Sequence, residues 1–422
     1  MTTVKQCRRC FFRKSGQVRS VIFGLLLLAP TLFALQPAAA QTFIELYPFN
    51  TSGTLADGGW PEAAVVRDAA GNIYGTTFYG GLGTGCDIIY NGCGVVFKLD
   101  SSGVETVLHI FSGAGDGWNP TGNLILDAAG DLYGATPLGG AHGYGTVFKI
   151  DPSGNETILY SFTRGTDGAN PNAGLVMDAW GNFYGTTQYG GRGNDRHGNG
   201  TVFEVSAGGQ ERVLYRFEGG LDGASPLGGT VVDSSGNIYG TTWVDGLYGF
   251  GTVFRVDSHG KEKVLHSFAG GTDGANPLGS LVLDPAGNLY GTTSAGGPYG
   301  FGTIFTIDAT GRQSTLYSFT GGSDGAYPYS NLILDTGGNL FGTISQGGCC
   351  GAGGVFEFSG GTLTTLYGFA GTTDGAYPMS GLAMDTAGNL YGTTVEGGTY
   401  GWGSVFEIQL SNPSNNNAGT IQ

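Results

Sequence analysis

Short runs of apolar and aromatic residues recur along most of the chain, and polar turn residues separate them in a fixed order. One copy shows an apolar run at 280–283, an aromatic and β-branched run at 289–293, and further strand-like runs at 303–307 and 314–319. Between the first two runs stands Pro-Ala-Gly-Asn, whose Gly and Asn tolerate the positive φ angles of a tight hairpin. The pattern therefore predicts units of four antiparallel β-strands.

The unit recurs seven times. Its most regular part reads D-x-x-G-N-[IL]-Y-G-T-T with small variations, and begins at Asp68 in the first copy and at Asp385 in the last. The aromatic position of this motif is filled by Tyr74, Tyr133, Tyr184, Tyr239, Tyr290, Phe341 and Tyr391. These positions are 59, 51, 55, 51, 51 and 50 residues apart, and a period near 50 is typical of propellers and solenoids. We therefore predict an all-β fold, a seven-bladed β-propeller with four antiparallel strands per blade, as a single domain over residues 41–410.

The two ends of the repeat region complement each other. Residues 43–49 resemble the fourth strand of a unit, although no first three strands precede them, and the last unit stops near Leu410 after three strands. We expect the N-terminal strand to complete the last blade and so remove an open sheet edge. An open solenoid is the alternative, but neither end carries the polar capping repeat that such a stack needs.

Connections between the predicted strands differ in length. The first-to-second and third-to-fourth turns are short and uniform, whereas the second-to-third and fourth-to-first loops are long. Alternate connections of an antiparallel blade emerge on the same face, so we expect one long-loop face and one short-turn face. Both sizeable insertions, 81–94 and 191–200, fall on the long-loop face, and loops on a rigid scaffold commonly carry binding residues.

Eight residues of this face are the predicted ligand-binding residues. Four lie in the insertions, which have no counterpart in other copies: Tyr90, Arg192, Asp195 and His197. Four are tyrosines of the Gly-rich second-to-third loops, expected to be exposed and able to stack on sugars: Tyr144, Tyr248, Tyr299 and Tyr400. Their aromatic neighbours are expected to fill gaps between blades: Phe250, Phe301 and Trp402.

Catalytic chemistry is not evident in the sequence. It contains no H-E-x-x-H motif and no Cys-His spacing, so no catalytic residue, metal or cofactor is assigned. We interpret the Asp of the recurring D-G-A-x-P loop, for example Asp167, as binding its own loop backbone. A ring of these seven Asp residues that binds a cation is the alternative. His109 and His266 stand where other copies have Tyr, and we expect them to serve packing.

Composition supports a folded β-protein. Gly accounts for 83 of 422 residues, yet no G-X-Y period exists, and 40% hydrophobic residues are enough for a core. Without residues 1–40, the chain has 12 cationic and 33 acidic side chains, a net charge of −21. Such a charge repels phosphate backbones, so nucleic acid is not an expected partner.

The N-terminus resembles an export signal. Six cations precede an apolar run at 21–35, and Ala38-Ala39-Ala40 provides a cleavage site. We predict a signal peptide at 1–40, no membrane span after cleavage, and a secreted, periplasmic or extracellular location; an uncleaved anchor is the alternative. The polar segment 411–422 is expected to be a disordered tail.

Four cysteines follow the predicted signal. In an oxidising compartment Cys86 and Cys93, which flank one insertion, are expected to form a disulfide. Cys349 and Cys350 are adjacent, and the sequence leaves their state open.

The combination of G-N-L-Y-G-T-T, G-G-x-x-G-x-G-T-V-F, L-Y-S-F and D-G-A-x-P resembles the GloVer tandem repeat of secreted or surface bacterial proteins over residues 42–410. The D-x-x-G-N-[IL]-Y hairpin is also similar to NHL-type propeller units. The resemblance implies export and an extracytoplasmic repeat domain, and it implies no enzymatic activity.

These observations lead to three functional hypotheses. We favour a non-catalytic binding module that recognises an extracellular glycan or protein through the long-loop face. A structural surface or matrix protein without a discrete ligand is the first alternative. An extracellular polysaccharide hydrolase or lyase is the second, and it would need acidic residues gathered at the propeller axis.

Overall fold

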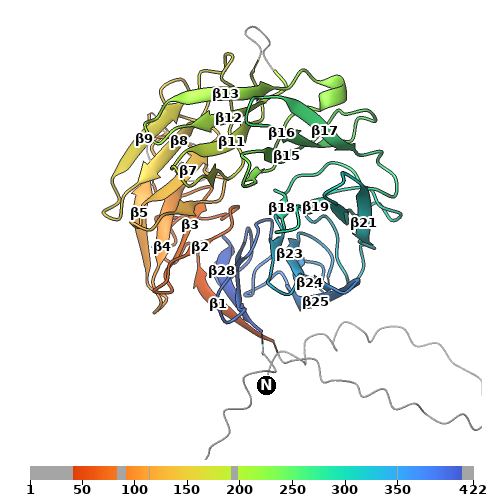
Figure 1. Cartoon of the computed structure of the whole chain (residues 1–422). Coiled ribbons are helices and arrows are strands. Elements are labelled where there is room, and N and C mark those ends of the chain that lie inside the picture. Colours follow the sequence, from red (N-terminus) through yellow and green to blue (C-terminus); the bar gives the residue numbers. More distant parts are fainter. Residues whose placement is uncertain (1–40, 83–91, 114, 192–197, 349, 411–422) are drawn as a thin grey trace, which may run out of the picture.

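The structure is a computed structural model that describes residues 41–82, 92–113, 115–191, 198–348 and 350–410. In these ranges seven four-stranded antiparallel sheets form a closed ring (Figure 1). The predicted seven-bladed β-propeller is therefore confirmed. We number the blades 1 to 7 along the chain, starting with the sheet β2-β3-β4-β5. No helix among the described residues is long and apolar enough to span a bilayer.

The two inner strands of each blade are uniform in length. The innermost strands are β2 (Val66–Arg67), β6 (Ile125–Leu126), β10 (Val176–Met177), β14 (Val231–Val232), β18 (Val282–Leu283), β22 (Ile333–Leu334) and β26 (Ala383–Met384). The second strands are β3 (Ile73–Thr77), β7 (Leu132–Thr136), β11 (Phe183–Thr187), β15 (Ile238–Thr242), β19 (Leu289–Thr293), β23 (Leu340–Ile344) and β27 (Leu390–Thr394). The first run of each unit, such as 280–283, is thus paired over only two residues, because the residues before them turn toward the axis of the ring.

The two outer strands are longer. The third strands are β4 (Val95–Leu99), β8 (Thr146–Ile150), β12 (Thr201–Val205), β16 (Thr252–Val256), β20 (Thr303–Ile307), β24 (Gly354–Ser359) and β28 (Ser404–Gln409). The outermost strands are β5 (Glu105–Ile110), β9 (Glu156–Ser161), β13 (Glu211–Arg216), β17 (Glu262–Ser267), β21 (Gln313–Ser318), β25 (Thr362–Gly368) and β1 (Thr42–Pro48). A short 3-10 helix, η2 (Gly220–Asp222), interrupts one loop.

Closure of the ring is as predicted. β1 pairs antiparallel with β28, from Thr42 opposite Gln409 to Pro48 opposite Ser404, and completes blade 7. The segments at the two ends of the ring thus lie side by side in Figure 1. Phe49, which follows β1, is fully buried against Val65 and Phe97 of blade 1. The N-terminal strand therefore joins the last blade to the first.

A repeated aromatic pair packs each blade against the next. In blades 4 and 5, Phe268 and Phe305 are both fully buried and meet edge to face at 5.1 Å between ring centroids. The same arrangement recurs at every blade junction, with centroids 5.0 to 5.5 Å apart. Gly291 of β19 lies over the Phe305 ring, where an added Cβ would stand 2.7 Å from the ring. The invariant Gly of the G-T-T motif is therefore required by close packing rather than by a turn.

The Asp residues that begin the hairpins bind their own turns. In the first-to-second turn, Asp284 accepts hydrogen bonds from the backbone N–H groups of Ala286 and Asn288 and from the Tyr290 hydroxyl. In the D-G-A-x-P loop, Asp167 accepts from the Tyr160 hydroxyl and from the Thr163 N–H at 3.0 and 2.8 Å. Both Asp classes are held by the repeat itself.

Candidate functional site

Both sets of long loops lie on one face, as predicted. In each blade a residue of the D-G-A-x-P loop forms a β-bridge with a residue just beyond the second strand, for example Ala275 with Ala295. Each blade also binds the next through this face, because the N–H of Asn276 donates to the carbonyl oxygen of Phe250 in the preceding blade. The residue before the proline, such as Asn276, has a φ of 54° in support of this bond. The long-loop face is thus a continuous, rigid ring of loops.

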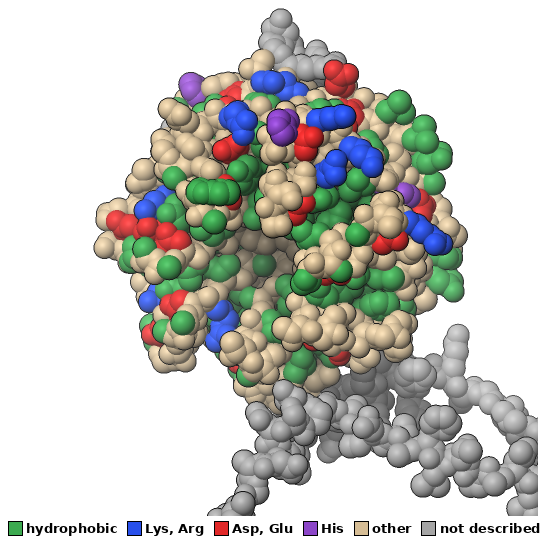
Figure 2. Space-filling model, viewed as in Figure 1, with side chains coloured by type: hydrophobic (Ala, Val, Ile, Leu, Met, Phe, Trp, Pro, Cys, Tyr) green, Lys and Arg blue, Asp and Glu red, His purple; other side chains and the backbone are tan. Residues whose placement is uncertain are grey.

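A pocket of about 120 Å³ lies at the centre of the ring. Figure 2 shows the molecule hollowed at this axis, with mostly uncharged side chains around the hollow. Each blade contributes the residue that follows the proline of its D-G-A-x-P loop, so the pocket belongs to the long-loop end of the axis. These seven residues are Glu62, Thr121, Asn172, Leu227, Leu278, Tyr329 and Met379. The repeat therefore fixes where these seven residues lie around the axis, whereas their side chains differ from blade to blade.

Glu62 is the only acidic residue that lines this axial pocket. It is largely buried, and no described residue gives it a hydrogen bond or an ion pair. Burial raises the pKa of Glu62 to about 7. A carboxyl group without a protein partner, in a polar pocket, is available to a ligand as an acceptor or, when protonated, as a donor.

Three asparagines give the axial pocket defined hydrogen-bonding groups. The side-chain oxygen of Asn123 accepts the backbone N–H of Ala64 at 2.8 Å, and that of Asn331 accepts the N–H of Ser280 at 2.5 Å. These bonds fix each amide, so its NH₂ group remains for the pocket. Asn172 is oriented the opposite way, since its NH₂ donates to the side-chain oxygen of Gln188 at 2.8 Å. The axial pocket thus combines two amide donors with one amide acceptor and the Glu62 carboxyl.

This donor set does not favour a metal ion at the axis. Hard cations such as Ca²⁺ take six to eight oxygen ligands. Here the oxygens of Asn123 and Asn331 already accept backbone N–H groups, and their NH₂ groups repel a cation. A neutral, hydroxyl-rich ligand uses both donors and acceptors and suits this arrangement better.

Three of the predicted binding tyrosines are exposed at loop tips on the long-loop face. Tyr248, Tyr299 and Tyr400 have exposed fractions between 49 and 60%. Among the described residues no ring contact joins them, so they surround the face individually and do not form a continuous aromatic belt.

Tyr144 differs from these three tyrosines, contrary to the prediction. It bridges Gly139 in the register in which Phe250 bridges Asp245 and Phe301 bridges Gly296. Tyr144 therefore occupies the inner aromatic position, where it is half-buried and covered by the Arg164 guanidinium 5.2 Å from its ring centroid. The prediction grouped Tyr144 with the wrong position, although its spacing to the following Gly-Thr matches that of Phe250 and Phe301.

The inner aromatic residues themselves only partly meet the expectation. Phe301 and Trp402 pack against the hydrophobic clusters of neighbouring blades. Phe250 is 40% exposed, because its ring lies over the backbone of Gly270 rather than in a gap.

Other predicted residues fall outside the described ranges: Tyr90, Arg192, Asp195, His197 and Cys86. Cys93 is fully buried beside Phe111 and Val96. Its pairing with Cys86 stays a prediction, as do the signal peptide at 1–40 and the tail at 411–422.

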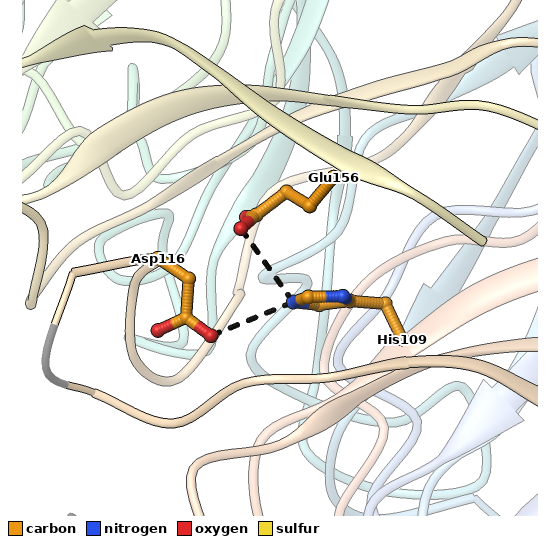
Figure 3. A group of neighbouring side chains, drawn as sticks. All are labelled: His109, Asp116 and Glu156. Carbon is orange, nitrogen blue, oxygen red and sulfur yellow. Dashed lines mark ion pairs between the residues drawn. The ribbon is translucent and has the colours of Figure 1, made fainter.

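A second polar group lies at the outer junction of blades 1 and 2. His109 packs edge to face on Phe111, as Tyr160 does on Phe162, so its expected packing role is confirmed. Its imidazole also faces Asp116 and Glu156 (Figure 3), and these three side chains could hold a metal ion. No sequence pattern marks this group, because its members belong to three different motif positions of two repeats.

Comparisons with known proteins agree with this architecture. The family model described as the Gloeobacter/Verrucomicrobia repeat matches residues 82–285 and 263–420. No curated protein matches the chain. The extracellular domain of BT4673, assigned to a one component system of B. thetaiotaomicron, is 12% identical with a TM-score of 0.56; the match covers 91% of this chain and 42% of that one.

A second solved structure, the gluconolactonase XC5397 from Xanthomonas campestris, is 16% identical with a TM-score of 0.43 over 73% of this chain and 87% of that one. At these identities the similarity concerns the fold alone. The chain also spans less than half the length of the BT4673 domain.

Proposed function

We propose that this chain, which belongs to the Gloeobacter/Verrucomicrobia repeat family, is a non-catalytic binding module of a secreted or periplasmic protein. Its ligand is the end of an extracellular glycan, seated at the axis of the long-loop face. The observation that supports this proposal is the axial pocket, in which hydrogen bonds to the backbone orient the amides of Asn123 and Asn331 and no described residue pairs with the Glu62 carboxyl.

The chemistry of the axial pocket suits sugar hydroxyl groups. A hydroxyl both donates and accepts, and here the donors Asn123 and Asn331 line the same pocket as the acceptors Asn172 and Glu62. Water occupies about 30 Å³ in the liquid, so 120 Å³ holds about four waters or one edge of a sugar ring. The exposed tyrosines of the same face can then stack on residues further along the glycan.

The two alternatives are less well supported. Hydrolysis of a glycosidic bond commonly uses two carboxyl groups on either side of the bond, and Glu62 is the only acid among the pocket-lining residues. A purely structural role predicts a uniform axis. The seven pocket positions carry six different residue types, whereas the surrounding hairpins are nearly identical.

Glycan-array screening of the mature chain, followed by titration of any glycan that binds, tests the proposal. Glu62→Gln and Asn331→Asp are the informative variants. Asn331→Asp keeps the oxygen that accepts the Ser280 N–H but removes the NH₂ donor. We expect each variant to weaken binding at least tenfold, or about 1.4 kcal/mol, with unchanged secondary structure.

Two controls separate the possible outcomes. Trp180→Ala removes a side chain that is 83% exposed in a first-to-second turn of the short-turn face, and it should leave binding unchanged. The axial site would be contradicted if Tyr299→Ala abolished binding while both axial variants still bound the glycan. That result would place the ligand on the loop tips. Absence of any glycan ligand would favour the structural alternative.

A further inference from the structure

Five of the seven blade junctions carry a polar triplet on the outer side. The triplet combines a Tyr or His near the end of one outermost strand, the Asp of the next D-G-A-x-P loop, and the first residue of the following outermost strand. At the other two junctions the third position is filled by Leu363 and Phe43. Blades 2 and 3 show the common form, in which the Tyr160 hydroxyl donates to Asp167 at 3.0 Å beside Glu211. The Asp of the common triplet is thus satisfied by the tyrosine.

At six of the seven junctions a direct hydrogen bond joins the Tyr or His side chain to the Asp carboxylate. The five tyrosine junctions have hydroxyl-to-carboxylate distances of 2.8 to 3.0 Å. The sixth has histidine, and its His266 Nε2 lies 3.1 Å from Asp273 Oδ2. Gln313 stands there in place of the glutamate, so this histidine faces a single carboxylate.

The junction between blades 1 and 2 is different. His109 Nε2 lies 3.6 Å from Asp116 Oδ2 and 3.7 Å from Glu156 Oε2, and it has no hydrogen-bond partner in the described structure. The Glu156 side chain is only 10% exposed, and its Oε1 is buried without a partner among the described residues. The equivalent atoms at three other junctions are buried without a partner as well: Glu105, Glu211 and Glu262. The unpartnered His109 Nε2 is therefore what sets this junction apart. One atom from each of His109, Asp116 and Glu156 lies within 4.8 Å of the other two.

These separations are too wide for hydrogen bonds and are close to those around a bound metal. A Zn²⁺ ion with bonds of about 2.0 to 2.1 Å and tetrahedral geometry holds its ligand atoms about 3.3 Å apart. A shift of a few tenths of an ångström would bring His109 Nε2 to that spacing from each of the two carboxylate oxygens. At the His266 junction, by contrast, the histidine already lies within hydrogen-bonding distance of the Asp273 carboxylate.

We propose that His109 Nε2, Asp116 and Glu156 form a binding site for one divalent transition-metal ion of the Zn²⁺ class. Two carboxylates and a neutral imidazole balance the charge of such an ion, and water can complete the coordination. Asp116 is already oriented for this role, because it accepts hydrogen bonds from the backbone N–H groups of Ser112 and Gly113. Two carboxylates share this junction, and no described Lys or Arg pairs with either of them. The ion would tie blade 1 to blade 2.

The test is titration of the metal-free mature chain with Zn²⁺ by calorimetry, together with thermal unfolding with and without Zn²⁺. We expect one Zn²⁺ per chain and a rise in Tm. Tetrahedral Co²⁺ absorption in the visible range should appear with the same stoichiometry, and Ca²⁺ should not compete, because imidazole is a poor ligand for it.

The repeat supplies matched variants. His109→Tyr installs the residue of five sister junctions, and Glu156→Gln installs that of the His266 junction, so both should fold. Each should weaken Zn²⁺ binding at least thirtyfold, whereas His266→Tyr should not change it. Failure of the wild-type chain to bind Zn²⁺, or equal binding by His109→Tyr, would overturn the proposal.

Discussion

The seven short hairpins and the seven axial segments belong to the same repeat but have diverged differently. Six of the hairpins keep an identical bond, with the Tyr hydroxyl donating to the Asp carboxylate at 3.0 to 3.2 Å. The axial segments keep their backbone path and change their side chains, from Glu62 to Leu227 to Met379. Residues that every blade needs for folding are repeated, whereas residues that serve one site in the whole ring are not.

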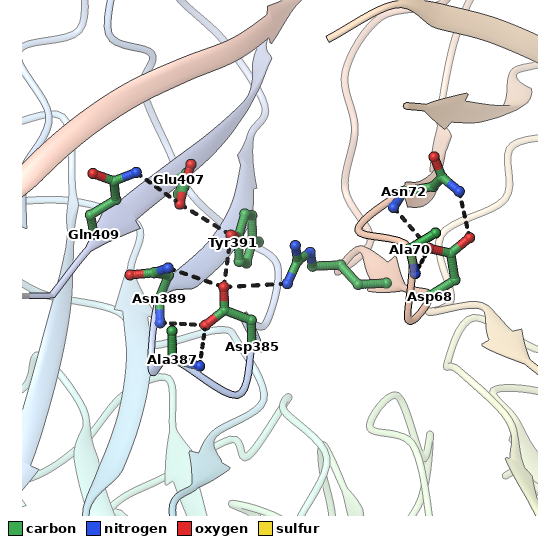
Figure 4. Close-up of polar contacts among 10 residues, drawn as sticks. Asp68, Ala70, Asn72, Asp385, Ala387, Asn389, Tyr391, Glu407 and Gln409 are labelled. Atoms are coloured by element: carbon green, nitrogen blue, oxygen red, sulfur yellow. Dashed lines mark hydrogen bonds and ion pairs between the residues drawn. The ribbon is translucent and has the colours of Figure 1, made fainter. Parts of the chain in front are cut away.

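The junction of the first and last blades adds a contact that other junctions lack. The Arg67 guanidinium pairs with Asp385 at 3.4 Å and lies 4.0 Å from the centroid of the Tyr391 ring. Figure 4 shows this contact between two hairpins that are otherwise alike, one with Asp68 and Asn72 and the other with Asp385 and Asn389. The position of Arg67 is occupied by apolar residues in the other six innermost strands. Closure of the ring is therefore reinforced by side chains outside the repeat pattern.

The largest expected effect concerns this closure. Phe49→Ala removes a fully buried ring from the contact between β1 and blade 1 and should cost about 3–5 kcal/mol of unfolding free energy. Chemical denaturation measures it. Trp180→Ala, at an exposed turn, is the control and should change stability by less than about 0.5 kcal/mol. Equal effects of the two variants would show that β1 does not hold the ring closed.

A smaller effect distinguishes the two kinds of short turn. Asp284→Ala leaves the backbone N–H groups of Ala286 and Asn288 and the Tyr290 hydroxyl without their acceptor, and should cost about 2 kcal/mol. Asp308→Ala in the exposed third-to-fourth turn should cost clearly less than Asp284→Ala, because water can replace the carboxylate there. Thermal and denaturant unfolding compare the variants. A greater loss for Asp308→Ala would contradict the structural importance assigned to the first-to-second hairpin.

The smallest effect is a pH dependence at the outer junctions. Burial, and then the charge of Asp167, raises the pKa of Glu211 to about 7, so the folded state favours the protonated acid. The stability that this acid contributes is complete below the unfolded pKa of about 4.3 and is lost as pH rises through 7. Glu211→Gln, which copies Gln313, should therefore match the wild type at pH 4 and be about 1 kcal/mol more stable at pH 8, after allowance for solvent screening. A constant difference across pH would contradict the raised pKa.

Much of the fold could be predicted because each repeat contains its own evidence. Asp284 and Asn288 lie within one turn, so the spacing of their motif predicts the hairpin. Gly291 pairs with Phe305 of the next strand in the same repeat, so this contact also lies within one copy.

The aromatic loop positions were misassigned: Tyr144 stands two residues before the Thr of G-T-V-F, as Phe250 does, whereas Tyr248 stands four residues before it, and the β-bridges show the same register. The axial pocket was not predicted by residue, since its members are marked by no motif of their own.

By itself, the sequence determined the number of blades, the strand order, the two unlike faces and the closing N-terminal strand, because these follow from contacts within one repeat or between its copies. Only the tertiary structure decided which non-repeated side chains meet. Glu62, Asn123 and Asn331 come from blades 1, 2 and 6, and His109 meets Glu156 across a blade boundary. Closing a ring brings such distant positions together, and neither period nor composition records which residue each blade places there.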